Sequence, residues 1–240
     1  MAEQVLLNCQ IFHGGYDLSG KHNEISLAYG ADIKDKTPLN VTSRRKIAGL
    51  CDAEISGGGF WSAADLDAVL FNGLTVDDQI FTISPSSGAI GSLAYMLKAV
   101  DGEYVPGAQI GELVGFNFAA YGMGDLVRGI IMENAAKTAT GTGTARQLAA
   151  VSATQKIHAS LHVLSISGTA TPTVTVTIDS NDENVWTGGE TERFAFTAAT
   201  AIGAQWLTVD GAITDTWWRV SWEISGTDPS ILIAVMLGIR

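Results

Sequence analysis

Pairs of acidic side chains are the groups of this sequence whose spacing would suit catalysis or metal binding. Three pairs lie at expected turns or at the start of an expected helix: Asp65 with Asp67, Asp77 with Asp78, and Asp182 with Glu183. Paired carboxylates can act as general acid and base or bind calcium. At helix starts and in turns, however, acidic side chains favour the positive helix end or simply face water. We therefore interpret all three pairs as solvated groups.

Histidines offer a second kind of chemistry. His158 and His162 would share one face of an expected strand, but they lie among apolar residues and lack a carboxylate at ligand spacing, so we interpret both as structural. His13 and His22 lie near expected turns, which favours solvated side chains. Residues 141–144 lack the lysine of a phosphate-binding loop, and no Gly-x-Ser-x-Gly nucleophile motif occurs. We predict no catalytic, cofactor or metal site and no enzymatic activity.

The tryptophans and cysteines also allow a chemical and a structural interpretation. Trp217, Trp218 and Trp222 fall within one short segment and could stack on sugars, as in carbohydrate-binding modules. Clustered aromatic residues more often form a core or a subunit contact, and a β-sandwich could bury one face of this segment and present the other. Cys9 and Cys51 are too few and too far apart for a zinc site or a disulfide framework, so we expect reduced thiols.

The charge balance argues against a protein that binds nucleic acid tightly. The chain has 14 Lys plus Arg against 25 Asp plus Glu, a formal net charge of -11 at pH 7. Phosphate binding needs a basic surface that releases counterions, and the one short basic cluster is Arg44, Arg45 and Lys46. An acidic surface can still line a path along which DNA passes without sticking, because like charges suppress close contact.

Composition and periodicity predict an all-β protein with one main helix. The chain of 240 residues contains 27 glycines and 5 prolines, and its many Thr, Ser and Val residues suit short strands and turns. The clearest helix spans residues 62–72. Its apolar residues recur at helical spacing, and Ser62 is a candidate N-cap.

Two segments before this helix are expected to form surface. Residues 31–46 are too polar for a core and predict an extended loop or an exposed hairpin. Residues 47–55 predict a strand whose two-residue period places Asp52 and Glu54 on one polar face. We expect the glycine run at 57–59 to weaken regular pairing after this strand.

Three consecutive parts are expected along the chain. They are a β domain over 1–137, a linker or surface loop over 138–155, and a β-sandwich unit over 156–240. The longest apolar run, 231–239, is far shorter than the ~20 residues that cross a membrane as a helix, so we expect no membrane anchor. No basic region precedes the first apolar stretch, which argues against a secretory signal and favours assembly in a cytoplasm.

A series of short, non-catalytic motifs runs through most of the chain. They are Tyr16-Asp17-Leu18-Ser19-Gly20, Gly49-Leu50, Gly111-Glu112-Leu113-Val114, Leu126-Val127-Arg128-Gly129, residues 158–167, and Thr214-Asp215-Thr216-Trp217-Trp218-Arg219-Val220. Together with the polar loop that holds the basic cluster and with the glycine run, their order resembles the tail tube (major tail) proteins of long-tailed bacteriophages, the siphophages.

The resemblance implies a β-sandwich or barrel flanked by a helix, and chains that join into rings, usually hexameric, stacked into a tube. Inward strands would pair across subunits, so that edge strands are not left exposed. Such a subunit is a structural protein of the virion tail, synthesised and assembled in the bacterial host cytoplasm. Its implied partners are copies of itself, the tape-measure protein, other tail proteins, and double-stranded DNA that passes without sequence-specific binding.

On this resemblance the polar loop would reach a neighbouring ring or subunit. Its candidate contact residues are all charged: Asp32, Lys34, Asp35, Lys36, Arg44, Arg45 and Lys46. The basic triplet would meet acidic partners there. Asp52 and Glu54 either face the lumen of the tube or belong to an outward, solvated face.

Other functions stay open on the sequence. One alternative is another virion structural protein, such as a head decoration protein. A second is a carbohydrate-binding or adhesin β-sandwich that uses Trp217, Trp218 or Trp222. Within a tube subunit, the C-terminal part could decorate the exterior, join a larger tube domain, or supply a second tube-like unit, which would change the ring from six chains to three.

Overall fold

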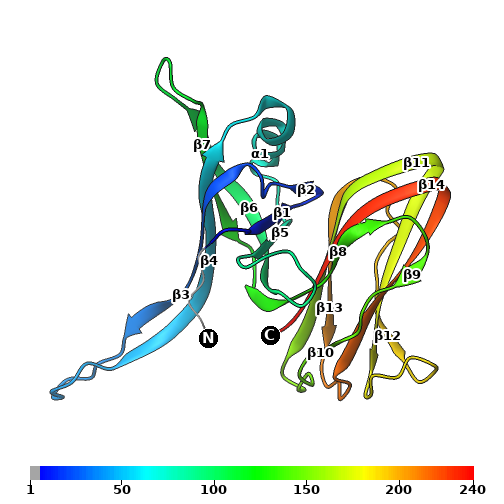
Figure 1. The fold of residues 1–240 in the computed structure, drawn as a ribbon. Helices are drawn as coiled ribbons and strands as arrows, with labels where there is room; N and C mark the ends of the chain where they lie inside the picture. Colours follow the sequence, from blue (N-terminus) through cyan, green and yellow to red (C-terminus); the bar gives the residue numbers. More distant parts are fainter. Residues whose placement is uncertain (1–5) are drawn as a thin grey trace. The chain divides into compact units, whose positions relative to one another are not determined.

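The computed structural model describes residues 6–240 and consists mainly of antiparallel β-strands (Figure 1). One helical segment interrupts them, formed by the π-helical turn η1 (Ala63–Asp67) and helix α1 (Ala68–Gly73). The predicted all-β class with one main helix is confirmed. No helix of the described residues is long and apolar enough to cross a membrane. The start of the chain, where the sequence argues against a secretory signal, lies outside the described residues.

Residue contacts divide the chain into two compact units made of interleaved segments. Unit 1 contains the described part of Met1–Gly20, Ile80–Met96 and Val127–Arg240, and unit 2 contains Lys21–Gln79 and Leu97–Leu126. These units differ from the consecutive parts expected over 1–137, 138–155 and 156–240. The reason is long-range pairing, because β8 (Val127–Lys137) and two short strands after it all pair with β14 (Trp217–Ile239).

Unit 1 is a β-sandwich with one large hydrophobic core and a second, smaller buried cluster. Besides β8 and β14, its strands are β1 (Gln10–His13), β2 (Tyr16–Asp17), β5 (Gln79–Ser84), β9 (Gly141–Thr142), β10 (Arg146–Gln147), β11 (Lys156–Asn181), β12 (Thr191–Ala195) and β13 (Gly203–Asp210). The two longest strands, β11 and β14, pair along their lengths, with register shifts between Val163 and Thr173. Leu161 and Val176 come from opposite halves of β11, yet both line the same core. The β11–β14 pair therefore bends near the register shifts, and its two halves lie on opposite sides of the core as the two layers of the sandwich.

Unit 2 contains an antiparallel sheet in the order β6–β7–β4–β3. Its strands are β3 (His22–Asp35), β4 (Lys46–Phe60), β7 (Gly115–Gly122) and the later part of β6 (Leu93–Gly107), which begins in unit 1. One face of the sheet buries Ile55 and Phe118, and the helical segment buries Leu66. The Tyr104 hydroxyl of β6 donates a hydrogen bond to Asp67 Oδ1 of the helical segment at 2.8 Å. This contact joins the helical segment to the buried face.

The glycine run at 57–59 lies inside this sheet and stays paired on both sides. The expectation that it weakens regular pairing holds only on the β3 side, where the register shifts between His22 and Glu24 opposite Gly59 and Gly58. Pairing with β7 is regular, and the reason for the glycines is close backbone approach. A Cβ on Gly57 would lie 2.6 Å from the Glu24 carbonyl oxygen, and one on Gly58 would lie 2.7 Å from that of Phe116. Glycine therefore permits β3 and β7 to pack against β4 at this point.

Candidate assembly surfaces

Beyond the rest of the unit 2 sheet, β3 and β4 continue as a two-stranded ribbon, residues 31–52 (Figure 1). The third strand, β7, pairs with β4 only from Glu54 onward. The two strands pair as far as Asp35 opposite Lys46. The segment that the sequence predicts as an extended loop or an exposed hairpin is thus an exposed hairpin.

The ribbon has no hydrophobic core of its own. Every residue of 32–52 is exposed, including large apolar side chains. Leu39 is 92% exposed and Leu50 is 86% exposed. A lone two-stranded hairpin is at best marginally stable in water, and clustered exposed apolar groups mark interaction sites. The ribbon is therefore suited to be covered by a partner.

The predicted contact residues all lie on the two strands of this ribbon or in the turn that joins them. They are Asp32, Lys34, Asp35, Lys36, Arg44, Arg45 and Lys46. Lys34 forms an ion pair with Asp32, and hydrogen bonding by the Thr37 side chain and backbone lowers the pKa of the Asp35 carboxyl. Among residues 6–240, no ion pair involves Lys36 or the basic triplet. Their charge is available to an acidic partner.

One face of the unit 2 sheet carries carboxylates and no basic side chain. Strand pairing places these carboxylates on the side away from the buried Ile55, and we call this side the acidic face: Glu24, Asp52, Glu54 and Glu103. Glu24, Glu54 and Glu103 line one shallow hollow. Away from the ribbon, the paired stretches of the four strands, residues 22–30, 52–60, 99–107 and 115–122, contain no lysine or arginine. The sequence indicated the shared face of Asp52 and Glu54 but missed Glu24 and Glu103, because those residues join it only through long-range pairing.

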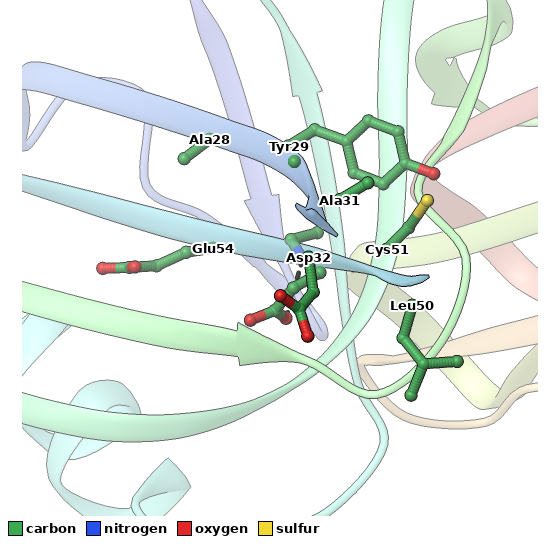
Figure 2. A pocket seen from close by; sticks show the side chains of 10 residues that line it. Ala28, Tyr29, Ala31, Asp32, Leu50, Cys51 and Glu54 are labelled. Carbon is green, nitrogen blue, oxygen red and sulfur yellow. Dashed lines mark hydrogen bonds between the residues drawn. The ribbon is translucent and has the colours of Figure 1, made fainter. Parts of the chain in front are cut away.

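Where the ribbon begins, β3 and β4 together line an open hollow (Figure 2). The Tyr29 ring and Cys51 lie on one side of β4, and Leu50 and the Asp32 carboxylate lie on the other. Asp32 thus lies on the Leu50 side of the ribbon, where its charge is paired with Lys34. Cys51 is exposed and, like Cys9, is a free thiol.

A second projecting feature is the β6–β7 connection, residues 108–114, which we call the tip. Phe60, at the end of β4, pairs with Gly115, so the tip lies at the end of the sheet opposite the ribbon. Ile110 is fully exposed and Leu113 is 73% exposed. The sequence reasoning missed this surface, although several apolar residues follow the Pro106-Gly107 turn.

His13 and His162 of unit 1 are both buried, and one of them does not lie where the sequence suggests. His162 is buried, and its ring nitrogens lie 2.8 Å from Thr82 Oγ1 and 2.7 Å from the Gly14 carbonyl oxygen. Burial lowers the pKa of His162 to about 4. The expectation that His13 is solvated is wrong, because it is 2% exposed and stacks on Phe81 at 4.2 Å. Pairing of β1 with β5 places these two rings opposite each other.

The remaining histidines pack against other side chains. His22 is half-buried, not solvated, because it packs edge-on against Phe116 with ring centroids 5.1 Å apart. His158 Nδ1 lies 3.0 Å from Thr208 Oγ1. Within the described part of the chain, no group of three or more His, Cys, Asp or Glu side chains is placed to hold a metal ion.

The tryptophan segment belongs mainly to the core of unit 1. Trp218 is 0% exposed and Trp222 is 7% exposed. Trp217 points to the other strand face and is half-buried. Buried rings cannot stack on a sugar, so at most Trp217 is available for that contact.

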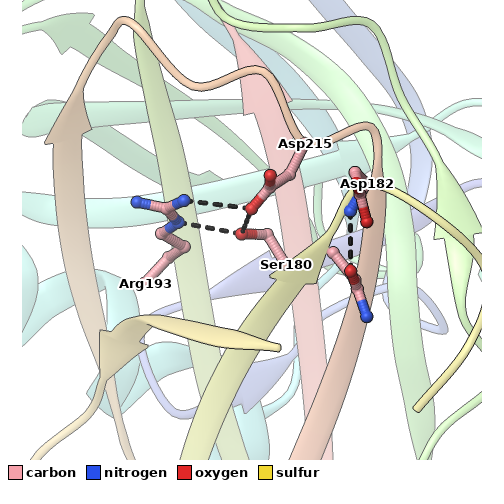
Figure 3. A network of polar contacts seen from close by, with 5 residues as sticks. Ser180, Asp182, Arg193 and Asp215 are labelled. Carbon is pink, nitrogen blue, oxygen red and sulfur yellow. Dashed lines mark hydrogen bonds and ion pairs between the residues drawn. The ribbon is translucent and has the colours of Figure 1, made fainter. Parts of the chain in front are cut away.

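A polar network joins three segments of unit 1 (Figure 3). Ser180 of β11 donates a hydrogen bond to Asp215 Oδ2 at 2.6 Å, and Arg193 of β12 donates one to the same oxygen at 3.0 Å. The Ser180 hydrogen bond, with a further contribution from Arg193, lowers the pKa of Asp215. The network joins the ends of β11 and β12 to the segment that holds Asp215.

The members of the Asp65–Asp67 pair form separate contacts. Asp65 forms an ion pair with Lys21 at 2.9 Å, whereas Asp67 accepts hydrogen bonds from Trp61 and Tyr104. Such separate partners suit a structural role for each carboxylate.

Comparisons with known proteins give structural likenesses alone. No family model and no curated protein matches the sequence. A chain from the virion of a native gene transfer agent (GTA) particle is similar with a TM-score of 0.41 and 18% identity, over 52% of this chain and 97% of that chain. A chain from the tail of an empty GTA particle with C6 symmetry is similar with a TM-score of 0.37 and 18% identity, over 44% of this chain and 80% of that chain.

The SPP1 Dit protein, described as a paradigm of the hub adsorption apparatus in Gram-positive infecting phages, gives a TM-score of 0.39 and 10% identity, over 97% of this chain and 99% of that chain. The chain is thus similar in structure, at low identity, to components of phage and GTA tails. Likenesses at these scores establish neither a family nor a function.

Proposed function

We propose that this chain is a non-enzymatic structural subunit of a phage-type tail, which assembles with its own copies into rings of six that stack into the tail tube. The open sheet of unit 2 carries the proposal. Within that unit, β3 and the part of β6 beyond Asp101 each pair on one side alone. Exposed edge strands are templates for pairing with another chain. In a closed ring, each β3 edge would pair with the β6 edge of the next copy.

The acidic face supports a lumen through which DNA passes. The helical segment joins the opposite face of the sheet through Asp67 and Tyr104, so the bare face is the one suited to line a channel. On a wall formed by Asp52, Glu54 and their acidic neighbours, phosphates would meet like charge and no cation. Duplex DNA would therefore slide without sequence-specific binding, and the tape-measure protein would fill the same channel before ejection.

The ribbon supports contact with a neighbouring ring or subunit. Its apolar side chains are exposed and its basic triplet has no ion-pair partner among the described residues. The seven charged residues named above would form this contact. The proposed location is the virion tail, with assembly in the bacterial cytoplasm alongside other tail proteins.

One alternative function is disfavoured by a specific observation. A sugar-binding module would need accessible aromatic rings, and Trp218 and Trp222 lie in the core. A head decoration protein, or a tail component that forms a single ring, is distinguished from a tube subunit by the assembly that it forms.

Electron microscopy of the purified full-length protein over a concentration series tests the proposal. We expect rings with six-fold symmetry that stack into tubes, with the unit 2 sheets joined between copies. Rings that never stack would indicate a ring-shaped tail component other than the tube. Isolated trimers would indicate a decoration protein, and persistent dispersed monomers would contradict self-assembly.

A shortened variant tests the contribution of the ribbon. Because Asp35 pairs with Lys46, residues 36–45 can be replaced by Asn-Gly, which forms a two-residue hairpin turn. We expect this variant to fold, as measured by circular dichroism and gel filtration, and to lose tube formation. Normal tubes formed by this variant would show that residues 36–45 are not needed for the proposed assembly.

A further inference from the structure

The two ends of the unit 2 sheet carry different, complementary surfaces. At the tip, Ile110 and Leu113 are exposed, and residues 108–114 contain Glu112 but no lysine or arginine. At the ribbon, exposed leucines occur beside an excess of basic over acidic residues. Each end therefore combines uncovered apolar side chains with the charge opposite to that of the other end.

These two surfaces cannot meet within one copy. β4 has 15 residues and runs from the ribbon at Lys46 to Phe60 beside the tip. At roughly 3.3 Å per residue, its ends are about 45 Å apart. A contact between tip and ribbon therefore requires two copies of the chain arranged head to tail.

We propose that the tip of one copy seats on the ribbon of a copy in the adjacent ring, an inference that rests on the proposed stacking of rings. Ile110 and Leu113 cover Leu39 and Leu50, while Glu112 faces the basic triplet of Arg44, Arg45 and Lys46. The contact joins two different surfaces, so repetition does not close it and continues along a line. Lateral edge pairing forms each ring, and this second contact stacks the rings in one direction.

Two surface variants separate the two sides of the contact. The tip variant is Ile110→Ser with Leu113→Ser, and the ribbon variant is Leu39→Ser with Leu50→Ser. All four side chains are exposed, so we expect both proteins to fold normally. Losing burial of two apolar side chains should raise the protein concentration needed for stacking by at least about 100-fold, while rings still form.

A mixture of the two variants gives the decisive measurement. The tip variant keeps an intact ribbon and the ribbon variant keeps an intact tip, so rings of one variant should bind rings of the other. Electron microscopy of preformed rings after mixing should show stacks of two rings and no longer tubes. Absence of two-ring stacks, or long tubes from either variant alone, would overturn the tip-to-ribbon contact.

Charge reversal provides an independent readout. One variant carries Glu112→Lys, and a second carries both Arg44→Glu and Arg45→Glu. Each variant should reduce the sedimented tube fraction, and the three substitutions combined in one chain should restore it. The matched control for the serine variants of the tip and the ribbon is Val185→Ser with Ile202→Ser. It changes two exposed apolar residues of unit 1 and should leave tubes unchanged.

The outcomes distinguish this inference from the proposed function. Wild-type tubes together with unaffected tubes from the tip variant would refute the inference alone. Loss of the rings themselves in the tip variant would show that the tip belongs to the lateral contact, which also refutes it. Wild-type protein that forms no ring would refute the proposed function.

Discussion

The two units differ in how their apolar side chains are covered. In unit 1, Trp218 and Ile233 are 0% exposed, and both belong to one core. In the ribbon of unit 2, Leu39 and Leu50 are among the most exposed side chains of the described residues. Unit 1 is therefore stabilised by its own core, whereas the apolar side chains of the ribbon are left uncovered within one copy. The difference indicates that folding and assembly can be altered separately in this chain.

The core of unit 1 should give the largest effect on folding. Trp218→Ala leaves a cavity at a fully buried position and should lower the free energy of unfolding by about 3–5 kcal/mol. Urea denaturation followed by tryptophan fluorescence measures the change. Leu50→Ala on the ribbon should change it by less than about 0.5 kcal/mol. Equal effects of both substitutions would abolish the contrast between the units.

The glycine run should give the next largest effect, within unit 2. Gly57→Ala places a Cβ 2.6 Å from the Glu24 carbonyl oxygen, and the required backbone shift should cost about 1–3 kcal/mol. Gly30→Ala is the matched control, because a Cβ at Gly30 would have no atom beyond its chain neighbours within 4 Å. Thermal unfolding compares the two variants, and a harmless Gly57→Ala would show that β3 can move away from β4.

The polar network of unit 1 should give a smaller, pH-dependent effect. The folded-state pKa of Asp215 lies below its ordinary value. The contribution of the Asp215 carboxylate to the free energy of unfolding is therefore fully present above the unfolded-state pKa of about 3.9. It is lost as pH falls through the folded-state pKa. Asp215→Asn should cost about 1 kcal/mol at pH 7 after discounting for partial solvent exposure.

Urea midpoints at pH 7, 5, 4 and 3 measure this dependence, with the pH values chosen to bracket the carboxyl titration. The difference between wild type and Asp215→Asn should shrink toward the acid end. A difference that stays constant with pH would exclude the Asp215 charge as its source. Asp210→Asn is the control, because Asp210 forms an exposed ion pair with Lys156 and should matter little at any pH.

The basic triplet should have the smallest effect on folding and a large effect on assembly. Replacing Arg44, Arg45 and Lys46 by Gln should change the free energy of unfolding by less than about 0.5 kcal/mol, while the sedimented tube fraction falls sharply. The control replaces three basic residues of unit 1 by Gln and gives the same change in net charge: Arg128, Lys156 and Arg240. Tubes that survive the first triple substitution would remove the triplet from the assembly contact.

Local patterns were sufficient to predict the features that depend on neighbouring residues in the sequence. Helical spacing located the helix near 62–72, polarity indicated an extended loop or an exposed hairpin, and the two-residue period put Asp52 and Glu54 on one face. These features follow from turn, helix and strand periodicity within a few residues. The roles proposed for the charged side chains in a tube stay predictions.

Features set by distant segments were missed. His13 is buried because β1 pairs with β5, about seventy residues later in the chain. Glycine at 57–59 looked like a break in the strand, but it fits two neighbouring strands that the local sequence does not reveal. The tip was missed because exposed apolar residues have the same local composition as buried ones.

The interleaving of the two units constrains how such a protein can change. The chain passes from one unit to the other at four peptide bonds: Gly20–Lys21, Gln79–Ile80, Met96–Leu97 and Leu126–Val127. Neither unit is encoded by one uninterrupted stretch of gene. A recombination event with a single breakpoint therefore cannot exchange one unit between related genes and keep the other intact. We therefore expect both parts of unit 2 to be inherited together. The outer strands β3 and β6, and β4 and β7 between them, should then change together in evolution.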